Sequence, residues 1–287
     1  MARIADLLAR GRTFSFEFFP PKTDEARRQL EKAVHELAPL KPSFVSVTYG
    51  ALGSTREFTR DAVVRINEDQ AFPAMPHLTC VGHARGDIDA LLDFYAAHGI
   101  ENILALGGDP PADGSDPGGD FRYATELIEV VRAHPAGFCV GVAAHPEVHP
   151  RSSDRAADRR HLAAKLAVAD FAITQFSFLP DEQLRLRDEL AALGSTTPVI
   201  PSVFPVINVA GITRMAAMNG SVIPAPLLER LEAAATPDDV VSIGVEAATD
   251  ICRQLLEADV PGIHLYPMNR SESIRRIFAN LGLGVGR

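Results

Sequence analysis

Short, almost uninterrupted apolar runs recur eight times along this chain, and each is followed by a polar stretch whose apolar residues have helical spacing. Strands that are apolar on both faces are typical of a parallel sheet covered by helices. The runs predict strands over Phe14–Phe19, Phe44–Tyr49, Met75–Cys80, Asn102–Leu106, Phe138–Ala144, Phe171–Phe178, Val199–Val206 and Gly262–Tyr266.

The intervening stretches predict helices, with Asp24, Ser54 and Asp181 at positions suited to N-caps. Strand–helix alternation indicates parallel βαβ units, and eight of them in 287 residues predict one (β/α)8 TIM barrel over residues 1–287. Residues Ile223–Ala234 predict an extra helix before the last βα unit. The remaining helices are expected over Asp24–Leu37, Ser54–Asn67, Asp87–His98, Tyr123–Ala133, Asp154–Val168, Asp181–Leu193 and Asp238–Ala258.

Charge and composition narrow the class of partner. The net charge of -9 argues against nucleic acid, because binding to phosphates needs a basic face. No apolar run of about 18 residues predicts a membrane span, and the N-terminus lacks the apolar segment of a signal peptide. The separated cysteines Cys80, Cys139 and Cys252 indicate buried free thiols. We therefore expect a cytoplasmic protein that acts on small molecules; its oligomeric state stays open.

Chemistry in such barrels lies at the carboxyl ends of the strands, and polar residues gather there in this sequence. Glu17, inside "FSFEFFPPK", is an acid among phenylalanines, so we expect a functional carboxyl group with a raised pKa. The alternative is a structural acid paired with an arginine. Other strand ends carry Thr48, Tyr49, His77, Asp109, His145, Glu147, His149, Gln175, Asn208, Asn269 and Arg270.

Two common chemistries fit poorly. The two histidines and the glutamate of "HPEVH" have side chains that bind zinc, but the flanking prolines exclude the helix of an H-E-x-x-H site. A Schiff-base enzyme needs a lysine at a strand end, and only Lys22 of the four lysines is near the expected mouth. Gln175 also has a structural reading, a hydrogen bond to a neighbouring strand.

Eight stretches taken together resemble the methylenetetrahydrofolate reductase family, and they follow the family order nearly end to end. The resemblance implies a (β/α)8 barrel that reduces 5,10-methylenetetrahydrofolate to 5-methyltetrahydrofolate. The stretches are "FEFFPPK" (16–22), "VSVTYGALGSTRE" (45–57), "HLTCV" (77–81), "GIENILALGGDPP" (99–111), "AAHPEVHP" (143–150), "AITQFSF" (172–178), "IPSVFPVIN" (200–208) and "YPMNR" (266–270).

The resemblance also implies roles for individual residues. Glu17 would protonate N10 of the folate, which opens the ring to an iminium that accepts hydride. Asp109 would stabilise that cation, and Gln175 would orient the pterin. Further substrate-binding positions are Thr48, Tyr49, Asn208 and Arg270, and the positions that face the cofactor are Thr48, His77, Asp109, His145, His149, Asp158 and Lys165.

Several positions that contact FAD in the family differ here. Gly107 replaces an arginine, His145 a tyrosine and Arg151 an acid, while His161 and Ala164 replace an asparagine and a basic residue. Arg151, Arg159 and Arg160 are candidates to compensate. These changes predict a flavin-independent branch in which NAD(P)H, as NADH or NADPH, gives hydride directly. The alternatives are ordinary FAD-mediated ping-pong reduction, a reductase for another pterin, and a folate-binding barrel without turnover.

Overall fold

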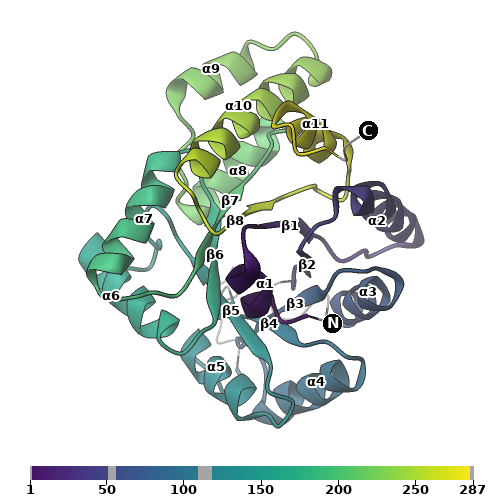
Figure 1. Cartoon of the computed structure of the whole chain (residues 1–287), viewed down its shortest axis with the longest axis vertical. Helices are drawn as coiled ribbons and strands as arrows, with labels where there is room; N and C mark the ends of the chain where they lie inside the picture. The colour runs from purple at the N-terminus through teal and green to yellow at the C-terminus, as the bar shows by residue number, and fades with distance from the viewer. Residues whose placement is uncertain (1, 51–55, 109–117, 285–287) are drawn as a thin grey trace.

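Eight parallel strands close into a barrel in chain order (Figure 1). The computed structural model describes residues 2–50, 56–108 and 118–284. All eight predicted strands are confirmed, most of them with shorter ends, and so is the TIM-barrel fold. The strands are β1 Thr13–Phe18, β2 Phe44–Val47, β3 Ala74–Thr79, β4 Asn102–Leu106, β5 Cys139–Ala144, β6 Phe171–Phe176, β7 Val199–Val203 and β8 Gly262–Leu265.

Helices surround the barrel, and the largest apolar core lies between them and the strands. The extra helix before the last unit is confirmed as α9. Three α-helices were not predicted, namely α1 Ile4–Arg10, α8 Val209–Asn219 and α11 Glu272–Asn280. The helices are α1 Ile4–Arg10, α2 Asp24–Leu37, α3 Arg56–Asp69, α4 Arg85–Ala97, α5 Ala124–Ala133, α6 Arg155–Leu166, α7 Pro180–Ala192, α8 Val209–Asn219, α9 Ala225–Glu232, α10 Pro237–Glu257 and α11 Glu272–Asn280, with a short 3-10 helix at Ala38–Leu40.

The predicted N-caps are wrong by one or two residues. Thr23 caps α2 by accepting a hydrogen bond from the Ala26 backbone, which leaves Asp24 as the first helical residue. Leu179 is the N-cap residue of α7, so Asp181 lies in the first turn, where its negative charge interacts favourably with the helix dipole. Ser54 lies outside the described residues.

The amino-terminal end of the barrel is closed by α1, which lies at the centre of the ring of strands in Figure 1. Ile4 packs into a second apolar cluster with Phe44, Met75 and Phe171, which come from the starts of their strands. The Asn102 side chain accepts a hydrogen bond from the Ile4 backbone at 2.7 Å and donates one to the Ala2 carbonyl. The barrel interior is therefore apolar and filled at this end, and polar chemistry is confined to the opposite end.

Strand register determines which polar side chains meet near the carboxyl end. Glu17 pairs with Ser46 across β1 and β2, and Ser15 pairs with His264 across β1 and β8. The pairing of β6 with β7 shifts between Ile173 and Phe176. Gln175 lies in that irregularity, and such irregularities often redirect a side chain next to a functional site.

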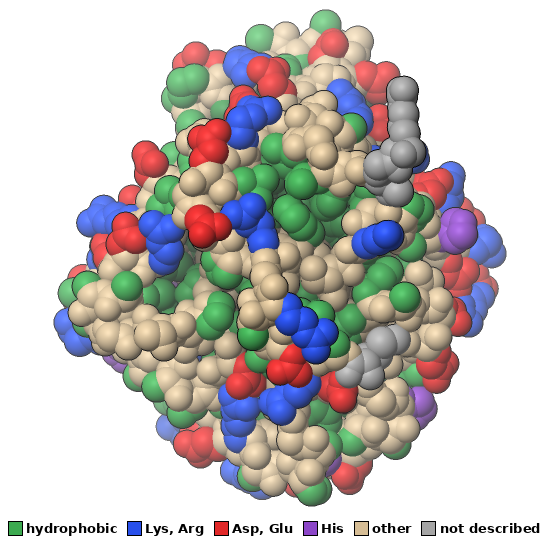
Figure 2. All heavy atoms as spheres, viewed as in Figure 1, with side chains coloured by type: hydrophobic (Ala, Val, Ile, Leu, Met, Phe, Trp, Pro, Cys, Tyr) green, Lys and Arg blue, Asp and Glu red, His purple; other side chains and the backbone are tan. Residues whose placement is uncertain are grey.

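The surface carries both signs of charge. In Figure 2, seen from the same side as Figure 1, Lys and Arg side chains are interspersed with Asp and Glu around the rim. Among the described residues, no helix is long and apolar enough to cross a membrane.

Candidate active site at the carboxyl ends of the strands

Glu17 lies inside the barrel between two imidazoles. Its Oε2 atom is 3.3 Å from Nε2 of His77 on β3 and 3.2 Å from Nε2 of His264 on β8. The exposed fraction is 8% for Glu17, 7% for His77 and 0% for His264. The Ser46 hydroxyl donates a longer hydrogen bond of 3.5 Å to the same carboxylate oxygen. The acid is therefore buried with histidine partners, and the arginine partner of the structural alternative is not found among the described residues.

The expected raised pKa of Glu17 is wrong for the free protein. Burial raises the pKa, but the charge of His77 and the hydrogen bond from His264 outweigh burial and lower the pKa from 4.5 to about 2. The phenylalanine-rich strand suggested only the burial contribution, because nothing local in the sequence shows which side chains face Glu17. In the free protein Glu17 is therefore ionised at neutral pH.

The sequence analysis missed His264 and Ser15. Ser15 Oγ is 2.7 Å from Nδ1 of His264, while Nε2 of the same ring faces Glu17. The ring stacks on Phe44 with an interplanar angle of 17° and meets Tyr266 edge to face. A signal was present in the sequence: Ser15 is two residues before Glu17, so both face the same side of a strand, and His264 is the one polar residue of "GIHLY".

Gln175 is half-buried on β6, and its side-chain oxygen accepts a hydrogen bond from the Phe176 backbone at 2.9 Å. No described residue accepts a hydrogen bond from its amide nitrogen, so that donor is available to a ligand. Thr48 follows β2, where its backbone nitrogen donates to Phe18 and its carbonyl accepts from Thr59. Thr48 therefore lies beside Phe18, the last residue of β1, which directly follows Glu17.

Three other predicted substrate-binding residues have local contacts of their own. The Tyr49 hydroxyl is hydrogen-bonded to His83 at 3.2 Å, and burial raises its pKa to about 12. Asn208 caps α8 through the Gly211 backbone, and Arg270 is exposed after β8. Their roles toward a substrate remain predictions, as does that of Asp109, which lies outside the described residues.

Asn269, adjacent to Arg270, holds the end of β1 in place. Its side chain accepts a hydrogen bond from the Phe19 nitrogen and donates one to the Phe19 carbonyl, both at 2.9 Å. Its backbone, with φ of 54°, is left-handed, a conformation that asparagine tolerates better than most residues. This pair of bonds positions the segment that immediately follows Glu17.

A second polar group surrounds the start of α6 and contains the remaining positions expected to face a cofactor. The rings of His145 and His149 are 4.4 Å apart. Asp158 accepts hydrogen bonds from the His149 backbone and the Ser152 hydroxyl. The Lys165 ammonium donates to the Ala143 carbonyl at 2.6 Å. These side chains are brought together as expected, but they bind largely to one another and to the backbone.

Arg159 crosses this group and is 3% exposed. Its guanidinium donates to the backbone carbonyls of residues 145, 146 and 147 and forms ion pairs with Asp158 and Glu189. All of its nitrogens are therefore engaged inside the protein. Burial, with the charges of His149 and Lys165, lowers the pKa of His145 to about 4, and burial lowers the pKa of Lys165 to about 8.

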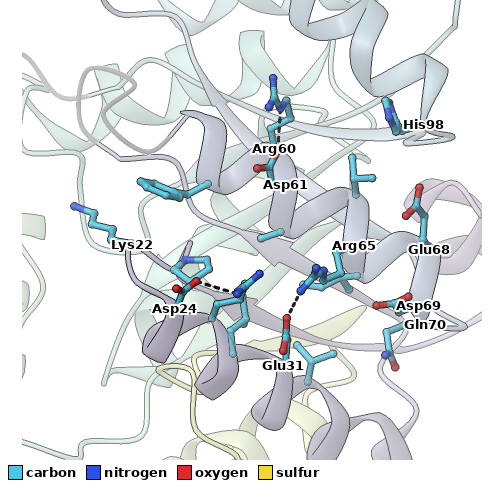
Figure 3. A pocket seen from close by; sticks show the side chains of 18 of the residues that line it. Lys22, Asp24, Glu31, Arg60, Asp61, Arg65, Glu68, Asp69, Gln70 and His98 are labelled. Atoms are coloured by element: carbon cyan, nitrogen blue, oxygen red, sulfur yellow. Dashed lines mark hydrogen bonds and ion pairs between the residues drawn. The ribbon is translucent and has the colours of Figure 1, made fainter.

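A wide groove also lies on the outside of the barrel between α2 and α3, and several of its charged residues pair with one another (Figure 3). Arg65 pairs with Glu31, and Arg60 pairs with Asp61. The groove contains no buried acid, so the Glu17 site is the better candidate for chemistry. In the described part of the chain, no cluster of three or more His, Cys, Asp or Glu residues could hold a metal ion.

Comparison with known proteins identifies the relatives of this chain. The family model described as methylenetetrahydrofolate reductase matches residues 3–282. The 5,10-methylenetetrahydrofolate reductase of Escherichia coli (strain K12) is 35% identical over 276 residues, covering 95% of this chain and 91% of that protein. Methylenetetrahydrofolate reductase (NADH) 1 of Arabidopsis thaliana is 33% identical, covering 98% of this chain and 50% of that protein.

A solved structure has a similar fold at low sequence identity. It is an uncharacterized protein from Clostridium thermocellum that binds two copies of 5-methyl-5,6,7,8-tetrahydrofolic acid, with a TM-score of 0.67 and 12% identity. The match covers 96% of each chain and supports the barrel architecture.

Proposed function

The chain belongs to the methylenetetrahydrofolate reductase family, and we propose that it reduces 5,10-methylenetetrahydrofolate with hydride taken directly from a reduced nicotinamide nucleotide. The observation that carries the proposal is the buried Glu17 at the carboxyl end of β1, held between His77 and His264. A site that only binds folate has no need of a proton source, whereas reduction consumes one proton for each hydride transferred.

Glu17 acts as the general acid in this proposal. The folate N10 accepts a proton from Glu17 as the bond between N10 and the methylene carbon breaks, which leaves an iminium at N5. Hydride from the nicotinamide then reduces that carbon to the methyl group. Gln175 offers its amide to the pterin, and Asp109 is the proposed carboxylate beside the cation.

FAD is the usual cofactor of the family, but the described residues around α6 fit it poorly. A pyrophosphate needs cations or free donors, and Arg159 has none to offer because its nitrogens are engaged. The Lys165 ammonium donates to the Ala143 carbonyl. Gly107 has no side chain that could contact FAD, and the space beside it is open. The exposed Arg151 and Arg160 remain the candidates to compensate. In this proposal the reduced nicotinamide nucleotide therefore gives its hydride directly to the folate.

The nicotinamide must then lie beside the folate, with its C4 about 3–3.5 Å from the methylene carbon. Both substrates would be bound together, so the kinetics would be sequential. The names of the plant relatives specify NADH, and NADH is therefore the donor to test before NADPH.

The test uses purified protein with NADH and methylenetetrahydrofolate, in the presence and absence of added FAD. We expect a colourless protein, intersecting initial-rate lines, no gain from FAD, and deuterium from labelled NADH in the product methyl group. Glu17→Gln should lower turnover by at least about 100-fold while leaving folate binding largely intact. A yellow protein with parallel lines would return the chain to flavin-mediated reduction, and folate binding without turnover would leave only the binding role.

A further inference from the structure

Glu17 needs a proton supply, and the structure contains a specific one. Each proposed turnover moves one proton from Glu17 to N10, yet the two imidazoles outweigh burial and leave Glu17 ionised in the free protein. Only 8% of the Glu17 surface is exposed, so bulk water has little access to it. A neighbouring group must therefore hold the proton until the folate requires it.

His264 has the better geometry of the two imidazoles. Its Nε2 atom is hydrogen-bonded to Glu17 at 3.2 Å, and its Nδ1 atom is bonded to Ser15 at 2.7 Å. His77 lies at a similar distance from Glu17, but among the described residues no hydrogen bond joins its ring to a second partner as Ser15 joins that of His264. The stacking of His264 on Phe44 and its contact with Tyr266 fix the plane of the ring.

Ser15 suits both charge states of His264. When the imidazolium gives up its Nε2 proton, the Nδ1 atom keeps its own hydrogen. The Ser15 oxygen can therefore accept a hydrogen bond from Nδ1 before and after the transfer. The titratable groups that face the ring are Glu17, His77 and Tyr266, and burial raises the pKa of Tyr266 well above 10.0, so Tyr266 stays neutral.

We propose that His264, oriented by Ser15, is a positioning residue that stores a proton on the ring and delivers it to Glu17 for each turnover. The Nε2 proton of the imidazolium moves to Oε2 of the ionised Glu17, and the carboxyl group formed in this way gives one proton to N10. The ring is left neutral, with its Nε2 lone pair facing Glu17. Water admitted after product release returns one proton to the ring through Glu17. The inference rests on the proposed function and adds a role for a residue outside the reacting atoms.

The test compares pH–rate profiles of the wild type, His264→Gln and Ser15→Ala. The glutamine amide can still donate to Glu17 but cannot store a proton. We expect the alkaline limb of kcat to move to lower pH in His264→Gln, with kcat at mildly alkaline pH reduced at least about tenfold and the KM for folate much less affected. Ser15→Ala keeps the imidazole and should shift the limb in the same direction by a smaller amount.

His134→Gln is the matched control, because His134 also pairs with a carboxylate, Asp93, but on the outside of the barrel. It should leave the profile unchanged. In the wild type, 15N shifts of labelled histidine should show His264 losing its proton over the pH interval of the alkaline limb.

A wild type without turnover refutes the proposed function itself. If the wild type turns over and the alkaline limb is unshifted in His264→Gln, only the proton store is refuted. If His264→Gln does not fold, two other results refute the proton store. One is an alkaline limb that is unshifted in Ser15→Ala, and the other is a 15N transition of His264 at a pH outside that limb.

Discussion

Replacing Glu17 by glutamine should change how stability depends on pH, and the structure supplies both sign and size. The pKa of Glu17 is lowered from 4.5 to about 2 in the folded protein. A carboxyl group with a depressed folded pKa stabilises the native state above its unfolded pKa, and this stabilisation is lost as pH falls through the folded value. The full shift corresponds to about 3 kcal/mol, because one pKa unit is worth about 1.4 kcal/mol.

The measurement is urea unfolding of the wild type and Glu17→Gln between about pH 5.5 and about pH 3, an interval between the unfolded and folded pKa values of Glu17 and just above them. About 2 of the 3 kcal/mol should disappear from the wild type over this interval and not from the variant. The stability difference between the two proteins should therefore shrink by that amount on acidification.

Glu147→Gln is the control of opposite sign. Burial raises the pKa of Glu147, so its ionised form is the costly one and the wild type gains stability as Glu147 becomes protonated. Its partner, the Ser177 hydroxyl, donates to Oε1 at 2.9 Å and can bond equally well to an amide oxygen. Parallel pH curves for the wild type and Glu17→Gln would refute the ionised, imidazole-paired state of Glu17 described above.

Three further predictions follow from single contacts. Gly107→Arg combined with His145→Tyr should raise FAD affinity, because nothing lies within 4 Å of a Cβ atom added at Gly107; flavin fluorescence quenching measures it, and unchanged binding would point to Arg159 as the obstacle. Gln175→Glu should weaken folate binding by at least about tenfold, since a carboxylate cannot donate as the free amide does; equal affinities by calorimetry at neutral pH would remove Gln175 from the pterin site. Asn102→Ala should lower the free energy of unfolding by about 1–3 kcal/mol, because the Ile4 nitrogen loses its buried acceptor; an unchanged denaturant midpoint would show that α1 closes the barrel without that bond.

The family motifs brought the candidate residues into one hypothesis, but they did not predict the ionisation of Glu17. "FEFFPPK" and "HLTCV" brought Glu17 and His77 into one hypothesis, and the barrel places them 3.3 Å apart. Arg159 shows the opposite case: the sequence presents it as a cation free to bind phosphate, whereas the fold turns it inward onto three carbonyls. The sequence alone does not show whether the guanidinium donors of an arginine are free or already hydrogen-bonded within the protein.

The sequence by itself determined the eight strands and the barrel, because periodic burial and strand–helix alternation are local patterns that one chain displays directly. It also determined that an acid lies at the end of the first strand. Only the tertiary structure decided what surrounds that acid. The register between β1 and β8 joins residues about 250 positions apart, Ser15 to His264, and no local signal specifies that pairing. The direction of the Glu17 pKa shift depends on those distant imidazoles, since burial alone moves a carboxyl pKa upward, whereas their charge and hydrogen bonds lower it.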